Sequence, residues 1–390
     1  MMSADIALAF EALDEAYARS RRLVLAYSGG KDSTAAAILL YQWARERGPR
    51  DLELVILHND TMSEIPPMEL WARRFMGELA SRLEDLGARP RVLVAAPGPT
   101  ETFYWRVFVR GYPAPTFNFR WCVYLLKTEP TRRALRRLGD YVVVVGSRDE
   151  ESSTRAKSMR LRFGSCPLSA GPGSCLGAML AADNDIPKVA PIRFWRESDV
   201  WAFLASQRDF DVSELFDLYA LGGRYGCWHC TLAAYQRGLH LRPEYAYVEA
   251  VRVLYRAASD APELRSPELR RFGGLGPLNA LGRSVVLNAI AVAEELAGGR
   301  FFYGLDESRA GEYTLREVFY ELPEAEADEV VARLDGTGRR VPVSELRGAA
   351  LRAGRRLAEA LAERAAAWLP PGPWRGDVLS AAERILGELS

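Results

Sequence analysis

The feature that most constrains the fold is the run of four valines in Tyr141–Val145. Consecutive β-branched residues without polar alternation favour a strand buried on both faces, as in the middle of a parallel sheet. Three more short apolar runs precede it, at Arg22–Tyr27, Glu53–His58 and Arg91–Ala95, and a last one follows at Val189–Ile192. Because helical stretches separate these runs, the sequence predicts an α/β fold with a doubly wound, mostly parallel sheet.

The helices that the pattern predicts for this sheet are Ser3–Ser20, Thr34–Arg47, Pro67–Leu86, Thr102–Arg110, a stretch ending near Arg137, and Glu197–Gln207. The polar, glycine-rich segment Gly146–Pro187 is predicted to be a long functional loop. From about residue 241 the pattern is helical, with helices expected at Glu244–Ala257, Leu278–Leu296, Ser344–Trp368 and Val378–Leu389, and Ser344 as an N-cap. We therefore expect an α/β domain over residues 1–240 and a helical region over 241–390.

Charge and composition exclude several classes of protein. The chain has 390 residues, and its 51 Lys and Arg balance 51 Asp and Glu, which argues against a general nucleic-acid coat. No apolar run is long enough to span a membrane, and acidic residues interrupt the N-terminal segment, so we expect a cytoplasmic protein. Five cysteines do not make a disulfide scaffold and indicate metal or redox chemistry instead. The oligomeric state is not indicated.

A glycine turn follows the first strand, with the sequence Ser-Gly-Gly-Lys-Asp-Ser over Ser28–Ser33. Two glycines let a ligand approach the backbone, and the following helix N-terminus offers N–H groups to an anion. Lys31 adds a positive charge. The spacing is not that of a P-loop, and the alternative is a tight turn without a ligand.

This turn resembles the PP-loop of the ATP pyrophosphatases, which belong to the adenine nucleotide α-hydrolase superfamily. Four further segments resemble, in order, motifs of its phosphoadenosine phosphosulfate (PAPS) reductase-like branch: Asn59–Pro66, Arg120–Pro130, Gly146–Arg155 and Pro191–Trp201. Together they cover about residues 20–235. The resemblance implies an adenine nucleotide α-hydrolase-like fold that binds ATP.

The resemblance also assigns roles to individual residues. It implies catalytic roles for Lys31, Asp32, Cys122 and Lys127. The residues expected to bind ATP are Ser28, Gly29, Gly30, Lys31, Asp32, Ser33, Asp60, Thr61, Glu64, Gly146, Arg148, Ser152 and Arg155. Lysine and backbone N–H groups can neutralise the departing phosphates, Asp32 or Asp60 can hold Mg²⁺, and the two arginines can clamp phosphates. The alternative interpretation of each arginine, taken by itself, is a solvated charge on the surface.

The cysteine pair Cys227–Cys230 has the C-x-x-C spacing that binds zinc or an iron–sulfur cluster, or forms a redox disulfide. Together with Cys122, the pair resembles iron–sulfur members of the branch. Among them the chain is most like the sulfurtransferase (C component) of Dnd-type DNA phosphorothioation. This implies a [4Fe–4S] cluster on these three thiolates, with Cys166, Cys175 or a non-protein group as the fourth ligand.

The expected function is that of an ATP-dependent sulfurtransferase, which adenylates an acceptor, releases pyrophosphate and then lets sulfur displace AMP. By resemblance, the acceptor is DNA and the sulfur donor a cysteine desulfurase; tRNA and small metabolites stay open as acceptors. One alternative is a PAPS or adenylyl-sulfate reductase, but such enzymes split no pyrophosphate and use a cysteine near the C-terminus, and no cysteine follows Cys230. Another is a non-catalytic DNA-modification module that only binds ATP. His58 and His229 are expected to be structural.

Overall fold

The fold is described from a computed structural model of the chain. The residues that it describes are 2–49, 51–98, 101–108, 110–151, 153–165, 172–183, 186–220, 226–232, 243–269, 274–298 and 354–390. The expected N-cap Ser344 lies outside them.

The chain divides into two compact units that interleave along the sequence. The sheet unit contains Met1–Asn59, Pro67–Ala95 and Thr131–Asp217, and the helical unit contains Asp60–Pro66, Ala96–Pro130 and Leu218–Ser390. This division differs from the expected boundary at residue 240. The two early segments of the helical unit follow the second and third strands, and they bury side chains such as Ile65 and Phe103 in the core of that unit. Local sequence patterns do not reveal such long-range packing.

A six-stranded sheet forms the centre of the sheet unit. Its strands are β1 Arg22–Tyr27, β2 Glu53–Asn59, β3 Arg89–Ala95, β4 Val142–Val145, β5 Leu180–Asp183 and β6 Ile186–Val189. The order is β3-β2-β1-β4-β6-β5, and every neighbouring pair is parallel except β5 with β6. The valine run pairs with β1 from Leu23↔Val142 to Ala26↔Val145. The predicted doubly wound, mostly parallel sheet is therefore confirmed.

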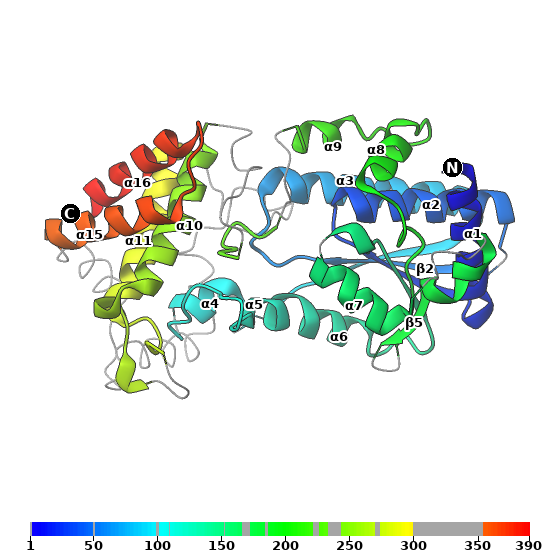
Figure 1. Ribbon diagram of the computed structural model, residues 1–390, viewed down its shortest axis with the longest axis horizontal. Coiled ribbons are helices and arrows are strands. Elements are labelled where there is room, and N and C mark those ends of the chain that lie inside the picture. The colour runs from blue at the N-terminus through cyan, green and yellow to red at the C-terminus, as the bar shows by residue number, and fades with distance from the viewer. Residues whose placement is uncertain are drawn as a thin grey trace. The chain divides into compact units, whose positions relative to one another are not determined.

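Helices cover both faces of this sheet (Figure 1). The helical elements around it are α1 Met2–Arg19, α2 Lys31–Arg47, α3 Pro66–Asp85, α6 Glu129–Leu135, the 3-10 turn Asp149–Glu151, α7 Ser153–Phe163, the 3-10 segment Pro172–Met179, α8 Glu197–Ala205 and α9 Ser213–Leu218. On one face, Leu135 of α6 packs on Val24, Val55 and Val143. Helices α2 and α3 lie along the opposite face in Figure 1.

Three local predictions for this unit were wrong. Helix α2 begins at Lys31 rather than Thr34, because Gly30 already serves as its extended N-cap. The expected loop Gly146–Pro187 contains α7 and β5, and α7 buries Met159 and Phe163. The last strand ends at Val189, since the following residues form a turn and Pro191 has no N–H for the ladder.

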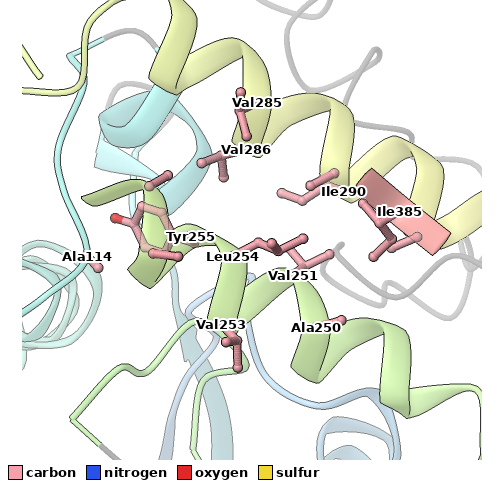
Figure 2. Close-up of a cluster of buried hydrophobic side chains, with 14 of the residues drawn as sticks. Ala114, Ala250, Val251, Val253, Leu254, Tyr255, Val285, Val286, Ile290 and Ile385 are labelled. Carbon is pink, nitrogen blue, oxygen red and sulfur yellow. The ribbon is translucent and has the colours of Figure 1, made fainter. Parts of the chain in front are cut away.

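The helical unit has its own apolar core. Its elements are α4 Phe103–Phe108, α5 Trp121–Val123, the π-helical turn Tyr124–Thr128, α10 Tyr245–Asp260, the 3-10 turns Pro262–Leu264 and Pro267–Leu269, α11 Ala280–Ala297, α15 Gly354–Trp368 and α16 Arg375–Leu389. Figure 2 shows Val251 and Leu254 of α10 packed with Ile290 of α11 and Ile385 of α16. Of the helices described, none combines the length and the apolar character that a membrane span requires.

Candidate functional site

The loop between β1 and α2 has its shape fixed by α3. Gly29 has a φ of 76°, and a Cβ placed on it would lie 2.8 Å from the Cβ of Ala72. The indole N–H of the neighbouring Trp71 donates a hydrogen bond of 3.0 Å to the Gly29 carbonyl. Position 29 therefore needs glycine for two reasons, its left-handed backbone and the close approach of a helix.

Hydroxyl groups inside the loop hold its second half. The backbone N–H of Ser28 donates to Ser33 Oγ at 3.2 Å, and this hydroxyl donates to the Gly30 carbonyl at 2.9 Å. The two serine hydroxyls lie 3.1 Å apart. Ser28 and Ser33, which the resemblance assigns to ATP binding, thus also stabilise the conformation of the loop.

Helix α2 starts at this loop without a side-chain cap. Its N-cap is Gly30, which makes no side-chain hydrogen bond to the first turn. The N–H groups at a helix N-terminus carry a partial positive charge, which suits a phosphate. Gly146, at the end of β4, packs against this turn so closely that a Cβ would lie 2.7 Å from the Asp32 carbonyl oxygen. The loop, the start of α2 and the residue after β4 are thus packed together as one structure.

Buried charges converge on the first turn of α2. Lys31 is 6% exposed, and its Nζ lies 3.3 Å from both Asp32 Oδ2 and Glu197 Oε1. Arg148, only 2% exposed, donates from Nε to Asp32 Oδ1 at 2.6 Å and from Nη1 to the Trp195 carbonyl at 3.2 Å. Arg148 therefore holds the Asp32 carboxylate in place.

Sequence reasoning did not single out Trp71 and Glu197, both of which contact this site. Neither residue lies in a recognisable spacing with the glycine turn, and only the packing of α3 and α8 brings them there. Ser152 lies outside the described residues. Arg155 lies in α7, where the path of its side chain is not described.

In the helical unit, the C-x-x-C segment binds to the turn that follows β2. The backbone N–H of Trp228 donates to the Ser63 carbonyl at 2.8 Å. The Thr61 hydroxyl donates to Glu64 Oε1 at 3.0 Å and lies 3.4 Å from Cys227 Sγ. Asp60 accepts the Met62 N–H at 2.8 Å, which shapes the same turn. Residues far apart in sequence are thereby brought together in this unit.

Lys127 and Glu64 form an ion pair beside these cysteines, with Nζ and Oε1 3.5 Å apart. The Glu64 carboxylate attracts the ammonium group and raises the pKa of Lys127, so the lysine stays charged. Burial, followed by the Glu64 charge, raises the pKa of Cys227, whereas the Lys127 charge acts in the opposite direction. The positive charge of Lys127 therefore favours the thiolate form of Cys227.

The free cysteines of the described chain are Cys122, Cys227 and Cys230, and all three lie in the helical unit. Burial and the neighbouring Cys230 raise the pKa of Cys122 to about 11. Cys175 is disulfide-bonded in the sheet unit, and Cys166 lies outside the described residues. No three His, Cys, Asp or Glu side chains in the described part of the chain are close enough to hold a metal ion.

His229, between the two cysteines, is a packed core residue. It is 1% exposed and stacks on Phe103 with ring centroids 3.9 Å apart. Burial, then the charge of Lys127, lowers its pKa to about 3. Both ring nitrogens lack a hydrogen-bond partner among the described residues, which favours the predicted structural role over proton transfer.

The expected site residues therefore fall into two sets. Those described in the sheet unit are Ser28, Gly29, Gly30, Lys31, Asp32, Ser33, Gly146 and Arg148. Those in the helical unit are Asp60, Thr61, Glu64, Cys122, Lys127, Cys227 and Cys230. Each set is organised by contacts within its own unit.

The chain is similar to a known protein family over more than half of its length. The profile of the phosphoadenosine phosphosulfate reductase domain matches residues 22–233. An uncharacterized protein of Methanocaldococcus jannaschii is 27% identical over 240 residues, which make up 61% of this chain and 49% of that protein. The chain thus spans about half the length of this curated relative. A solved PAPS reductase from Candida auris, in a phosphate complex, is similar with a TM-score of 0.37 and 18% identity, covering 57% of this chain and 88% of that one.

Proposed function

The chain belongs to the phosphoadenosine phosphosulfate reductase domain family, and we propose that it acts there as an ATP-dependent sulfurtransferase. The observation that carries the proposal is the start of α2, which has no side-chain cap and where Lys31 is buried in the first turn. This arrangement suits a departing pyrophosphate. Reduction of an adenylylated sulfate splits off no pyrophosphate, so it gives this lysine no such role.

In the proposed first step, an oxygen of the acceptor attacks the α-phosphorus of ATP. The bond from the α-phosphorus to the bridging oxygen breaks, and pyrophosphate leaves with that oxygen. Lys31 and the first-turn N–H groups of α2 would stabilise the negative charge that builds up on the leaving group. A sulfide equivalent then attacks the activated centre of the acceptor, and AMP leaves with the former acceptor oxygen.

The residues fit a magnesium ion only partly. Both carboxylate oxygens of Asp32 already contact cations, Oδ1 with Arg148 and Oδ2 with Lys31. Mg²⁺ prefers carboxylates that also leave room for phosphate oxygens and water. We therefore infer that any magnesium ion arrives bound to ATP, with Asp32 or Asp60 as a supplementary ligand.

The three free cysteines fit an iron–sulfur cluster better than a closed zinc site. A structural zinc ion needs its ligands gathered tightly around one atom, and no such group exists among the described residues. A [4Fe–4S] cluster spreads its thiolates more widely, and Cys230 is close enough to influence the pKa of both Cys122 and Cys227. When bound, a cluster with one iron free of protein ligands would supply a place for sulfide.

The finer assignment rests on resemblance. The segments that look most like the sulfurtransferase of Dnd-type DNA phosphorothioation are Asn59–Pro66, Arg120–Cys122 and Gly226–Thr231. We therefore propose DNA phosphate as the acceptor and a cysteine desulfurase as the sulfur donor.

The first test measures pyrophosphate release from ATP and ATP–pyrophosphate exchange. Lys31→Ala should abolish both, because the charge beside the leaving group is lost, while the far-UV circular dichroism stays that of the wild type. Lys157→Ala is the matched control, since this lysine is exposed in α7. Normal pyrophosphate release by Lys31→Ala would refute the proposed first step.

The second test quantifies iron and acid-labile sulfide after anaerobic purification. A brown protein with broad absorption near ~400 nm is expected from iron bound by sulfide and thiolate. Cys227→Ser and Cys230→Ser should each lower the iron content, whereas Cys175→Ser should not. A colourless protein that contains zinc would refute the cluster.

A third measurement separates the proposal from its alternatives. Incubation with adenylyl sulfate and a reductant should give no sulfite, and sulfite at enzymatic rates would favour the reductase. ATP binding without any pyrophosphate release, with acceptor and sulfur donor present, would favour the non-catalytic module.

A further inference from the structure

A segment of the helical unit combines aromatic and basic residues without any acidic one. Between Glu101 and Glu129 the sequence has no Asp or Glu, but it has nine aromatic residues and four basic ones, namely Arg106, Arg110, Arg120 and Lys127. The chain as a whole is neutral, so this segment is a local exception. Aromatic rings with interspersed cations are typical of surfaces that bind single-stranded nucleic acid.

Some of these rings are buried, but Phe117, Phe119 and Tyr124 are exposed. We call the segment Tyr112–Tyr124, which carries these three rings, the aromatic turn. At its tip, the N–H of Thr116 donates to the Phe119 carbonyl at 3.3 Å, and the N–H of Phe119 donates back at 3.1 Å. This closes a two-residue turn that presents Phe117, which is 72% exposed. Phe119 and Tyr124 are 44% and 51% exposed.

The base of the aromatic turn is firmly held. The Ala114 N–H donates to Ser259 Oγ at 2.8 Å, and the Thr231 hydroxyl donates to the Pro115 carbonyl at 2.6 Å. Ala114 also belongs to the buried core around Tyr255 (Figure 2). An exposed ring on such a rigid base loses little conformational entropy when a ligand stacks on it.

A cation accompanies the exposed ring. The guanidinium carbon of Arg120 lies 4.3 Å from the centroid of the Phe117 ring. Arg120 is exposed and forms no ion pair with a carboxylate in the described part of the chain. Its N–H groups can therefore reach a phosphate while the ring offers a stacking surface.

The aromatic turn is joined directly to the free thiols. Cys122 follows its buried Trp121, and Thr231, which holds Pro115, follows Cys230. A nucleotide stacked on Phe117 would thus be bound by the same structural element that carries Cys122.

We propose that the aromatic turn binds nucleic acid by stacking an unpaired base on Phe117 while Arg120 contacts a neighbouring phosphate. This inference rests on the proposed function, because it assigns the acceptor contact to named residues and requires single-stranded or locally opened nucleic acid. A docked protein, such as the sulfur donor, is the competing occupant and becomes an outcome of the test.

The test measures binding of fluorescent oligonucleotides to the full chain by anisotropy at fixed salt, without ATP. The probes are single-stranded DNA, RNA of the same sequence, and a fully paired duplex. Wild-type protein should bind single strands more tightly than the duplex, and the DNA and RNA arms identify the sugar that is preferred. Phe117→Ala should weaken single-strand binding about 5- to 150-fold, the range for loss of one base–aromatic stack.

Further variants distinguish stacking from apolar contact. Phe117→Trp should retain binding, whereas Phe117→Leu should behave like Phe117→Ala, because leucine keeps an apolar surface but has no π-face. Arg120→Gln should reduce the salt dependence of binding by about one ion contact. Leu269→Ala is the control, since Leu269 is a 49% exposed apolar residue of the same unit.

Three outcomes would overturn the proposal: no single-strand binding by the wild type, unchanged binding by Phe117→Ala, or full binding by Phe117→Leu, which would favour a protein partner. The readout is independent of catalysis. If single strands bind through Phe117 but ATP yields no pyrophosphate, the stacking surface stands and the proposed function fails. If pyrophosphate release is normal but Phe117 does not matter, only this inference fails.

Discussion

Replacing Gly29 by alanine should destabilise the protein more than the same replacement at a left-handed glycine that has open space beside it. The left-handed conformation alone costs a residue with a Cβ about 1–2 kcal/mol. The new methyl group would also lie 2.8 Å from the Cβ of Ala72, so α3 or the loop must shift. Overpacking of this kind costs about 1–3 kcal/mol, which brings the expected loss to about 2–5 kcal/mol.

The chain offers a matched control at Gly48, the C-cap of α2. Its φ is 55°, but a Cβ there would have no heavy atom within 4 Å. Gly48→Ala should therefore lower the free energy of unfolding only by the cost of the left-handed conformation, about 1–2 kcal/mol. A second variant, Ala72→Gly, removes the opposing methyl group, although it costs about 1 kcal/mol of helix stability on its own.

The assay is urea unfolding followed by tryptophan fluorescence, with pyrophosphate release measured on the same samples. Gly29→Ala should have the lower midpoint of the two glycine variants and should lose pyrophosphate release. Combining it with Ala72→Gly should recover about 1–3 kcal/mol in a double-mutant cycle. Equal midpoints for Gly29→Ala and Gly48→Ala, or additive effects in the cycle, would show that contact with α3 does not set this position.

Three more variants test other parts of the structure. Trp71→Phe removes the hydrogen bond to the Gly29 carbonyl and should cost about 1 kcal/mol in the same unfolding assay. Burial raises the pKa of Glu69, but the hydrogen bonds and charges of His58 and Arg73 together outweigh it, so the pKa is lowered. Its contribution is therefore full above the ordinary pKa of 4.5 and disappears as the pH falls below it, so the stability difference between wild type and Glu69→Gln should shrink from pH 6 to pH 3. His229→Phe should keep or slightly raise stability and retain bound iron, because the imidazole makes no hydrogen bond in the described structure; loss of iron would instead assign His229 a role in the cluster.

The sheet was readable from the sequence because its signals are local. The valine run and the other strands each show their apolar pattern over a few residues, and β1 was predicted with its observed limits. The errors occurred where local signals are weak. The polar sequence of α7 predicts a loop, whereas in the structure Met159 and Phe163 of this helix are buried against the sheet unit.

The division into units illustrates what a sequence pattern cannot contain. Residues 60–66 and 96–130 lie within the α/β pattern, yet they pack with helices that begin only at Tyr245. Apolar residues such as Phe103 indicate burial, but nothing in their spacing indicates against which partner. The sequence of the aromatic turn likewise does not indicate which residues hold it. Its base is fixed by hydrogen bonds to Ser259 and Thr231, which are far from it in the sequence.

The sequence by itself determined the chemistry that is available to this protein: a glycine turn with Lys31 ahead of a helix, and cysteines at a spacing typical of metal or redox sites. These follow from residue type and short spacing, which the linear chain carries. Only the tertiary structure decided how that chemistry is held. It set α3 against Gly29, buried Arg148 on Asp32, and placed Glu64 and Thr61 beside Cys227. Such contacts depend on long-range packing, in which the partner of each side chain is fixed by the fold as a whole.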